Sequence, residues 1–540
     1  MKSTMQDVPL QISRLLEYGA TTHATSTVST WTGDSARTIT YAEVGAHSAQ
    51  LANALRGLGI TGDQRVATFM FNNTEHLEAY LAVPSMGAVL HTLNVRLFPD
   101  QLAYIANHAE DKVIIVDGAV LPLLARVLPQ LETVEHLIIN GPADTSVLAG
   151  TSPQVHDYAT LIASQPTTFE WPDVDERDAA AMCYTSGTTG NPKGVVYSHR
   201  SIWLHSMQVC MKESFGLSDT DVVLAIVPQF HAMAWGLPYA ALMSGASLIM
   251  PDRFLQAAPL TTMIEQLRPN FAGAVPTIWN DLEHHLSANG GDISSMREVA
   301  VGGSACPPAL MRAFDDRGVT IIHAWGMTET SPLGSVARPP RGAEGDDAWR
   351  YRTTQGRLPA SVEGRLVGPD GGLMPHDGQA VGELEVRGPW ITASYYHDDD
   401  PLKFRDGWLR TGDVGTLTAD GYLTLTDRAK DVIKSGGEWI SSVELENDLM
   451  AHPEVVEASV VGVPDEKWGE RPLATVVLRE GSTVTLADLK AFLGDRLAKW
   501  QVPERWAVIT EVPKTSVGKF DKKVLRRQYA EGELDVKTVD

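Results

Sequence analysis

The first half of the chain alternates short apolar runs with amphipathic stretches. Each apolar run has the length of a buried strand, and each amphipathic stretch has the spacing of a surface helix. The pattern predicts strands at 65–71, 112–116, 136–140, 221–227 and 247–250, and helices at 76–86 and 121–131. Because strands alternate with helices, we expect largely parallel sheets with helices packed on their faces.

The pattern changes after about Arg350. Short strands between Gly and Asp turns, at 382–387, 415–418 and 422–426, predict a small antiparallel unit. Beyond Asp427, a helix at 441–450 begins with the capping-box spacing of Ser441 and Glu444, and strands at 457–463 and 473–479 and a helix at 486–499 follow. We expect a large domain over 1–427, a hinge at 428–431 and a small domain over 432–540. The polar block 339–350 is expected to be disordered.

Composition is that of a globular protein without structural staples. The chain has 540 residues, of which 43% are hydrophobic and 21% charged, so roughly three or four folding units are expected. Its three cysteines (Cys183, Cys210 and Cys306) lack CxxC spacing, which argues against a disulfide framework or a zinc site. No apolar run resembles a signal peptide or a membrane span. We therefore expect a cytoplasmic protein without a transmembrane segment.

Charge is strongly acidic and uneven along the chain. The formal net charge is −23, which makes nucleic acid and anionic membranes poor partners. Ten of the 15 lysines nevertheless lie beyond residue 427. Charge alone favours a solvated surface for this lysine-rich segment, and contact with an anion is the alternative.

The segment Ala179–Val196 carries the strongest chemical signal. An apolar strand leads into a loop of glycines and hydroxyl residues, and a second strand follows Lys193. Glycines let a backbone turn tightly and direct its N–H groups at one point, while hydroxyls and a lysine bind phosphate oxygens. It is not a Walker A loop, because Lys193 precedes a glycine and a strand is expected next. A simple hairpin is the alternative, but it would not require this concentration of donors.

This segment resembles the phosphate-binding loop of the acyl-adenylate-forming enzymes, which include acyl-CoA synthetases, luciferases and peptide-synthetase adenylation domains. The resemblance covers nearly the whole chain, because further motifs occur in the family's order. It implies an α/β fold in which a large N-terminal domain has two β-sheets sandwiched with helices and a small β-barrel-like unit. A small mobile α+β C-terminal domain follows. The implied phosphate contacts are Thr185, Ser186, Gly187, Thr188, Thr189, Gly190 and Lys193.

Further motifs resemble the family's acyl and nucleotide sites. In PQFHAMAWG, His231 corresponds to an imidazole beside the acyl and phosphate path. Trp235 corresponds to a gating tryptophan of long-chain acyl-CoA synthetases, with a packed core aromatic as the alternative. In VGGSACP, the resemblance implies that Gly302, Gly303 and Ser304 border the adenine and acyl pockets, with Gly302 also contacting the acyl group, and Cys306 is expected to be structural.

The motif AWGMTET is similar to the family's adenine and metal motif. By this resemblance Glu329 is a Mg²⁺ ligand assisted by Thr185, Thr328 contacts phosphate, and Pro332 borders the acyl group. The implied adenine-side contacts are Trp325, Gly326 and Met327. In WLRTGD and DRAK, Asp413 and Arg428 correspond to the residues that bind the ribose hydroxyls, and Lys430 to the hinge.

The C-terminal motifs resemble the family's thiol tunnel and catalytic lysine. KSGGEW implies coenzyme A contacts at Lys434, Ser435, Gly436, Gly437 and Trp439, with Lys434 also acting in catalysis. PKTSVGK places Lys519 at the catalytic lysine. The resemblance implies an ATP-dependent acyl-CoA synthetase that uses Mg²⁺ and coenzyme A, forms acyl-AMP with His231, Glu329 and Lys519, and is a homodimer.

The acid is expected to be uncharged and mostly apolar. His231 stands where amino-acid-activating relatives carry an Asp, which disfavours an α-amino acid. Similarity to bacterial enzymes favours a medium- or longer-chain fatty acid, with 3-methylmercaptopropionate or another short acid as the alternative. Gln229, which replaces an apolar residue, is expected to affect acyl preference near the gate. A stand-alone module that loads a carrier protein remains an alternative, and a catalytically dead binder is disfavoured by the complete motifs.

Overall fold

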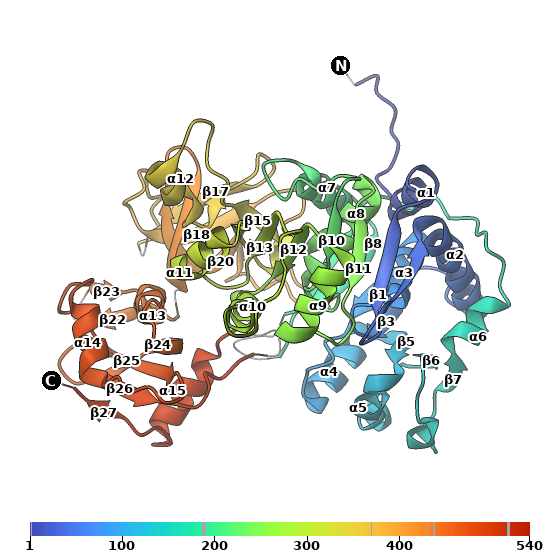
Figure 1. The fold of residues 1–540 in the computed structure, drawn as a ribbon. Coiled ribbons are helices and arrows are strands. Elements are labelled where there is room, and N and C mark those ends of the chain that lie inside the picture. The colour runs from blue at the N-terminus through green and yellow to red at the C-terminus, as the bar shows by residue number, and fades with distance from the viewer. Residues whose placement is uncertain are drawn as a thin grey trace.

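The computed structural model describes residues 1, 3–185, 191–368, 370–428, 430–435, 438–515 and 519–539, with Glu438 and Trp439 described in their backbone only. A large domain carries the N-terminal elements, and a small domain of the last 110 or so residues lies against one side of it (Figure 1). Within the described residues the strands form sheets of 14, seven and six strands. None of the helices in these ranges is both long and apolar enough to cross a membrane.

The seven-stranded sheet carries the glycine-rich loop at one edge. Its strands, in spatial order, are β7 (Gln154–Asp157), β6 (His136–Asn140), β5 (Asp111–Asp117), β3 (Arg65–Phe69), β4 (Val89–Thr92), β8 (Ala179–Tyr184) and β9 (Gly194–Ser198). All pairings are parallel except that of β8 with β9. A strand therefore follows the loop, as the sequence predicts, and the loop closes an antiparallel hairpin.

The 14-stranded sheet forms the second layer and changes character along its length. Its order is β17 (Glu363–Val367), β18 (Gly382–Arg387), β20 (Trp408–Leu417), β21 (Tyr422–Arg428), β16 (Gly356–Arg357), β15 (Leu333–Val336), β14 (Thr320–Gly326), β13 (Glu298–Val301), β12 (Phe271–Ala274), β10 (Val222–Leu224), β11 (Ser247–Met250), β1 (Thr27–Trp31) and β2 (Ala36–Thr40), with β19 (Phe404–Arg405) on β20. Strand β14 pairs in parallel with β13 and antiparallel with β15. The predicted antiparallel unit is thus continuous with the parallel sheet.

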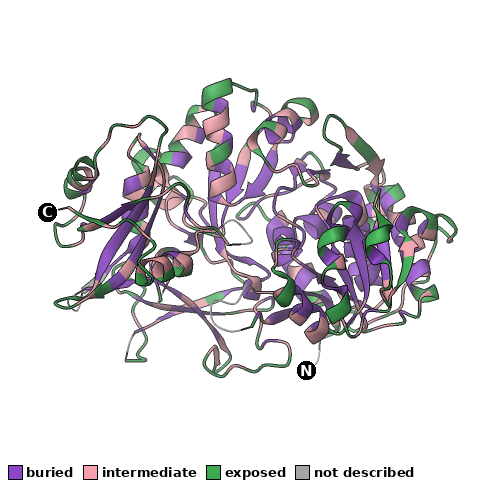
Figure 2. Ribbon diagram, turned by 90° about the horizontal axis from the view of Figure 1, so that it is seen from below, coloured by how far each residue is buried: buried purple, intermediate pink, exposed green. Residues whose placement is uncertain are grey.

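Helices fill the space between the two large sheets and cover their outer faces. The main core contains buried residues of both sheets together with residues of the helices between them, such as Leu15, Leu51, Leu81 and Leu242. Two further cores lie on the outer faces, under α4 and α5 on one sheet and under α9–α11 on the other. The helices are α1 (Ile12–Thr22), α2 (Tyr41–Gly57), α3 (Thr74–Ser85), α4 (Pro99–Ala109), α5 (Leu121–Ala125), α6 (Tyr158–Ala163), α7 (His199–Cys210), α8 (Leu237–Ser244), α9 (Ala257–Leu267), α10 (Pro276–Asn289), α11 (Pro308–Asp316) and α12 (Gly345–Arg352). Figure 2 shows the buried residues concentrated in the strands.

The small domain has its own sheet and its own core. Its strands are β23 (Glu438–Ile440), β22 (Ile433–Ser435), β25 (Gly469–Leu478), β26 (Arg505–Val508) and β27 (Lys537–Thr538), with β24 (Val455–Asp465) on β25. Helices α13 (Ser442–Met450), α14 (Leu486–Gly494) and α15 (Lys522–Ala530) cover it. The Ser441 side chain accepts a hydrogen bond from the Glu444 N–H and caps α13. Leu445, Leu489 and Trp506 are among its fully buried residues.

Three sequence expectations about local structure were wrong. The helix expected at 121–131 is split into α5 and a 3₁₀ turn at Leu128–Gln130, because Pro129 supplies no N–H for a continuous helix. The helix expected at 486–499 ends at Gly494. The block 339–350 is not wholly disordered, because α12 includes its C-terminal part. There Trp349 packs on the core beneath α11, with the Arg312 guanidinium 4.1 Å from its ring centre.

The hydrogen bonds between the two domains lie close to the expected hinge. Among the described residues, the side-chain hydrogen bonds that join the small domain to the large one end on Thr426 and Asp427. Ser441 donates to the Thr426 carbonyl at 2.6 Å, and the Ser442 N–H donates to the Asp427 carboxylate at 2.8 Å. Arg526, in α15 of the small domain, pairs with Asp431 at 2.7 Å. In the described chain, the hydrogen bonds between the domains thus lie next to the expected hinge at 428–431.

Candidate active site

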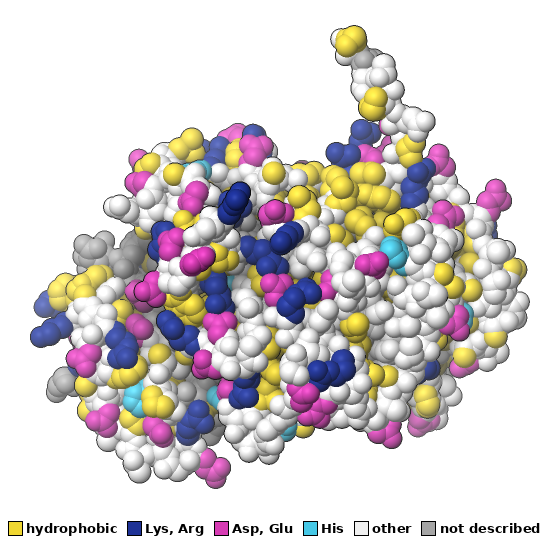
Figure 3. Space-filling view, turned by 45° about the horizontal axis from the view of Figure 1, so that its top comes forward, with side chains coloured by type: hydrophobic (Ala, Val, Ile, Leu, Met, Phe, Trp, Pro, Cys, Tyr) yellow, Lys and Arg dark blue, Asp and Glu magenta, His cyan; other side chains and the backbone are white. Residues whose placement is uncertain are grey.

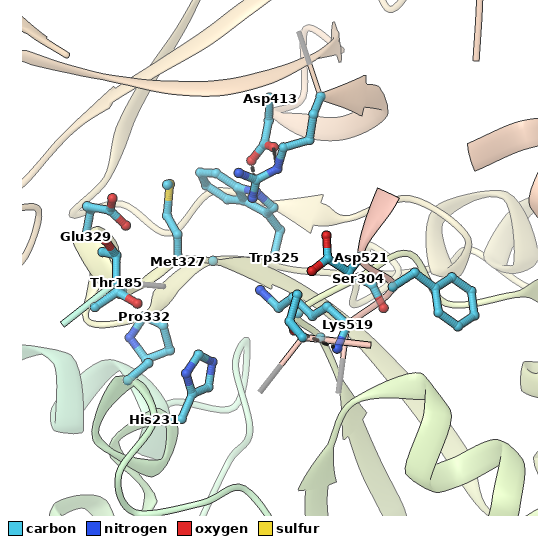
Figure 4. Close-up of a pocket in the computed structure, with 18 of the residues that line it drawn as sticks. Thr185, His231, Ser304, Trp325, Met327, Glu329, Pro332, Asp413, Lys519 and Asp521 are labelled. Carbon is cyan, nitrogen blue, oxygen red and sulfur yellow. Dashed lines mark hydrogen bonds and ion pairs between the residues drawn. The ribbon is translucent and has the colours of Figure 1, made fainter. Parts of the chain in front are cut away.

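Most of the sequence motifs contribute residues to one cavity of about 880 Å³ between the large and small domains (Figure 4). Parallel strands of an α/β sheet commonly place ligand sites at their carboxyl ends, and this cavity lies beyond the ends of β8, β13 and β14. The candidate residues that line it are Thr185, Lys193, His231, Trp235, Gly302, Gly303, Ser304, Trp325, Gly326, Met327, Thr328, Glu329, Pro332, Asp413, Arg428, Lys430 and Lys519.

The glycine-rich loop is held at its base by its own backbone. The Thr185 N–H donates to the Lys193 carbonyl at 2.9 Å, and the Lys193 N–H donates to the Thr185 hydroxyl at 3.4 Å. The Lys193 amine lies 2.6 Å from Asp400 and 3.1 Å from Asp398. This lysine, expected to contact phosphate, is thus paired with protein carboxylates. The remaining predicted loop residues, Ser186, Gly187, Thr188, Thr189 and Gly190, lie outside the described residues.

Three predicted nucleotide contacts form one hydrogen-bonded group. The Trp325 indole N–H donates to Asp413 at 2.8 Å, and the Arg428 guanidinium lies 2.8 Å from the other Asp413 oxygen (Figure 4). The negative charge of Asp413 raises the pKa of Arg428. Each carboxylate oxygen still has a second lone pair, so Asp413 can accept hydrogen bonds from a diol while its orientation is fixed.

Glu329 lies at another wall of the same cavity. Its side chain is largely buried, and one of its oxygens accepts a hydrogen bond from the Tyr395 hydroxyl at 2.7 Å. The Thr392 N–H donates to the Glu329 carbonyl at 2.9 Å. The segment 392–400 therefore contacts both Glu329, through Thr392 and Tyr395, and Lys193, through Asp398 and Asp400. One carboxylate oxygen of Glu329 is left for a further partner.

The chemistry of these donors is suitable for Mg²⁺. Magnesium takes oxygen ligands and usually shares one or two protein carboxylates with substrate phosphates. Glu329 offers a carboxylate oxygen, and Thr185 offers a hydroxyl in the same cavity. Within the described ranges, no cluster of three His, Cys, Asp or Glu residues forms a complete protein site. Nucleotide phosphates would therefore supply the remaining ligands.

His231 precedes an unusual left-handed turn at the cavity wall. Ala232, Met233, Ala234 and Trp235 have φ values of 43°, 53°, 50° and 56°, and Gly236 continues the turn. Left-handed conformation is unfavourable for residues with a Cβ, so surrounding packing must impose it. Burial, together with the positive charges of Lys519 and Arg96, lowers the pKa of His231 to about 3. The imidazole is therefore neutral at physiological pH.

The Trp235 side chain is buried against glycines of neighbouring strands. A Cβ on Gly302 would come within 3.3 Å of its ring, and a Cβ on Gly273 within 3.4 Å. The two glycines thus make room for the indole. Gln229, expected near the gate, is fully buried and does not line the cavity. Its expected effect on acyl preference has no direct contact to support it.

Lys519 brings a cation from the small domain into the cavity. Its side chain packs on Gly303, where an added Cβ would lie 3.3 Å from the Lys519 Cε. Burial lowers the pKa of Lys519 to about 8; the nearby Arg428 also lowers it, while Asp413 and Glu329 oppose the shift. The amine, His231 and Glu329 lie around the same open space (Figure 4).

Of the predicted coenzyme A residues, Lys434 and Ser435 are described with their side chains, and neither lines this cavity. Lys434 is exposed on β22, and Ser435 is buried beside it. The Ser435 hydroxyl accepts a hydrogen bond from the Arg471 guanidinium at 3.2 Å. The Trp439 backbone pairs with Lys434 in the β22–β23 hairpin. Gly436, Gly437 and the Trp439 side chain lie outside the described residues. In this conformation the small domain presents Lys519, rather than the Lys434 hairpin, to the site.

Several lining residues were not found by the sequence analysis, among them the polar residues Arg96, Tyr395 and Lys403. Each is a polar residue in a loop that follows a strand or precedes one. Arg96 lies four residues after the end of the apolar strand β4, and that position beyond a strand end was an available signal. Tyr395 and Lys403 lie in a polar loop whose sequence does not indicate which side chains face the cavity. Only the tertiary structure places them there.

Comparison with known proteins agrees with this geometry. A family model described as AMP-binding enzyme matches residues 16–396, and one described as AMP-binding enzyme C-terminal domain matches residues 444–519. The chain belongs to the AMP-binding enzyme family. The prediction of an AMP-forming acyl-CoA synthetase, an ATP-dependent acid–thiol ligase, is confirmed by its relatives.

The relatives cover almost the entire chain. A 3-methylmercaptopropionyl-CoA ligase of Ruegeria pomeroyi is 45% identical over 98% of this chain and 99% of its own length. A medium-chain-fatty-acid–CoA ligase of Ectopseudomonas oleovorans is 42% identical over 98% of both chains. Among solved structures, an anthranilate CoA ligase in complex with anthranoyl-AMP matches with a TM-score of 0.87, at 26% identity over 99% of this chain and 100% of that one. The predicted α/β fold is confirmed.

Proposed function

We propose that this enzyme activates a medium- or longer-chain fatty acid as acyl-AMP in this cavity and then transfers the acyl group to coenzyme A. The observation that carries the proposal is the convergence of Lys519, Glu329, His231 and the Asp413–Arg428 pair around one space. Asp413 and Arg428 would hold the ribose, and Trp325 and Ser304 would border the base. His231 and Trp235 would border the acyl group.

In the first half-reaction the substrate carboxylate attacks the α-phosphorus of ATP, and pyrophosphate leaves. Negative charge is redistributed over the phosphate oxygens, so catalysis is mainly positioning and electrostatic stabilisation. The Lys519 ammonium would stabilise that charge next to the acyl carboxylate. Mg²⁺ held by Glu329 and Thr185 would neutralise charge on the phosphates. No protein nucleophile is needed, and neutral His231 would help position the carboxylate.

In the second half-reaction the coenzyme A thiol attacks the acyl carbonyl, and AMP leaves. We propose that the small domain turns about Lys430 between the two steps, which removes Lys519 and brings in the Lys434–Trp439 hairpin. The hydrogen bonds between the domains are confined to Thr426 and Asp427 in the described chain. That attachment supports a rotation, because few hydrogen bonds between described residues must be broken.

A short acid such as 3-methylmercaptopropionate is the second candidate, and one observation favours it. The Trp235 ring lies against Gly302 and Gly273 beside the acyl wall. In this position the indole limits the depth available to an acyl chain. A fatty acid of longer chain would require the indole to move, whereas a short thioether acid would not.

Pyrophosphate release with acids from three to 16 carbons and with 3-methylmercaptopropionate tests the proposal. We expect the largest kcat/KM at a medium or longer chain, and a Trp235→Ala variant should shift the preference to still longer acids. A maximum at the short thioether acid would favour the second candidate. Absence of pyrophosphate release with all acids would contradict the function.

Coenzyme A is distinguished from a carrier protein by the second step. We expect free coenzyme A to accelerate AMP release from enzyme-bound acyl-AMP. No acceleration by coenzyme A, with acceleration by a carrier protein bearing a thiol arm, would instead indicate a loading module.

We further propose that the protein acts in the cytoplasm as a homodimer. Its proposed substrates, ATP and coenzyme A, are available there, and Cys183, Cys210 and Cys306 are free thiols, as in a reducing compartment. Light scattering coupled to size exclusion would test the assembly, and a monomer mass at micromolar concentration would contradict it.

A further inference from the structure

A lysine outside all the sequence motifs lies in the cavity wall. Lys403 is half-buried and lines the cavity from the loop before β19. Its N–H donates to the Asp400 carbonyl at 2.8 Å, and its carbonyl accepts from the Arg410 N–H at 2.9 Å. The large domain therefore fixes the backbone on both sides of this side chain.

The Lys403 charge is only weakly satisfied by the protein. Its amine donates one long hydrogen bond, 3.3 Å, to the Thr411 carbonyl, although an ammonium has three donors. It forms no ion pair with the described residues. Burial lowers the pKa of Lys403, and Glu329 and Asp413 oppose this shift from a distance. A partly buried cation in this condition would be stabilised by an anionic ligand.

Lys193 provides a contrast, because its two partners belong to the loop that carries Lys403. Asp398 and Asp400 pair with the Lys193 amine, whereas Lys403, three residues after Asp400, has no such partner among the described residues. The loop thus neutralises one cavity lysine and leaves the other available. An ordinary surface lysine would instead be solvated and outside the cavity.

The position of Lys403 indicates which part of a nucleotide it would contact. Its hydrogen-bond partner Thr411 is two residues before Asp413 on β20, at the proposed ribose end. The charge of Glu329, at the proposed phosphate end, also acts on it. The group of a nucleotide that lies between its ribose and its outer phosphates is the α-phosphate.

We propose that Lys403 is a further nucleotide-binding residue that contacts the α-phosphate of ATP and of AMP. The proposal rests on the proposed function for the identity of the nucleotide. Lys403 belongs to the large domain, so it would hold the phosphate through both half-reactions. Lys519, in contrast, leaves when the small domain turns.

Calorimetric binding of adenosine, AMP and ATP to a Lys403→Met variant tests the proposal. Methionine keeps the apolar stem and removes the charge. We expect AMP and ATP binding to weaken by about 10- to 100-fold, as for loss of a charged hydrogen bond, with adenosine binding unchanged. Lys403→Arg should retain AMP binding within a few-fold, and Lys212→Met, at an exposed position outside the cavity, serves as the matched control.

Other outcomes would overturn the assignment. Equal weakening of adenosine binding would indicate a structural or ribose effect, and weakening of ATP binding alone would indicate the outer phosphates. Unchanged binding of all three ligands would exclude a contact. Thermal melting verifies that each variant is folded. Failure of the proposed function is distinguishable, because wild-type protein would then bind AMP without acid-dependent release of pyrophosphate.

Discussion

The two walls of the cavity are built in different ways. On the large-domain wall, Asp413 is held by Trp325 and Arg428, and Glu329 is held by Tyr395. On the small-domain wall, Lys519 reaches the same space from a loop and packs on Gly303. The first wall is fixed by its own hydrogen bonds, whereas the second depends on the orientation of the small domain, which we propose to turn about Lys430. A permanent nucleotide site and a removable cation are the expected consequence.

The largest expected effect comes from removing the movable cation. Lys519→Met should slow acyl-AMP formation by about 10²–10³-fold or more, because one charge that stabilises the transition state is lost. Thioester formation from synthetic acyl-AMP should stay within a few-fold of wild type. Single-turnover assays of each half-reaction measure this, with exposed Lys537→Met as control. Equal loss of both steps would contradict a role confined to the first.

The hinge variant should give the opposite pattern. Lys430→Pro fixes the backbone φ angle and removes an N–H at the proposed pivot. We expect acyl-AMP formation to be retained within a few-fold, while transfer from synthetic acyl-AMP to coenzyme A falls by about tenfold or more. Lys430→Ala is the control, since it removes the side chain and leaves the backbone free. If the proline variant transfers the acyl group to coenzyme A at the normal rate, the proposed rotation about this residue is wrong.

Weakening the fixed wall should affect both steps. Asp413→Asn removes the partner of the Arg428 charge and leaves that guanidinium uncompensated. We expect AMP affinity to fall by about 10- to 100-fold, with both half-reactions impaired at low nucleotide concentration. Calorimetry with AMP gives the affinity, and Asp535→Asn on the exposed surface is the control. An effect on one half-reaction only would contradict the expectation that the large-domain wall serves both steps.

The pH dependence gives the smallest and most specific effect. The pKa of Lys519 is lowered to about 8, so its amine is charged below this pH and neutral above it. In the first half-reaction, kcat/KM for ATP should be constant below about 8 and fall about tenfold per pH unit above it. Lys519→Arg keeps its charge, so its profile should lack this decline, even if its rate is lower. The same decline in the arginine variant would assign it to another group.

Local features of the fold followed closely from the sequence. The strands at 136–140, 247–250 and 382–387 have the predicted bounds, because short apolar runs next to turn residues have few alternative structures. Ser441 caps α13 as its spacing indicates. Errors occurred where one residue overrides a longer pattern, as Pro129 does in the expected helix. Trp349 shows the reverse case, since one aromatic side chain orders a polar segment by packing.

The distribution of charge over the surface differs from its distribution along the chain. Figure 3 shows basic and acidic side chains interspersed over one face of the molecule. The lysine-rich segment therefore does not act as a single charged region on this face. Of its lysines, Lys519 enters the cavity, whereas Lys434 lies exposed on the small-domain sheet. Position in the fold, rather than number, decides which charge is used.

The sequence by itself determined the family, the reaction class and the candidate residues that meet in the cavity, because these depend on residue types at short spacings. Only the tertiary structure decided how those residues are paired. Asp398 and Asp400 neutralise Lys193 from about 200 residues away, and Lys403 is left without such a partner in the described chain. Electrostatic and packing energies depend on distance in space, which a linear pattern does not contain. The fold thus determines which cation is paired with protein and which remains for a nucleotide.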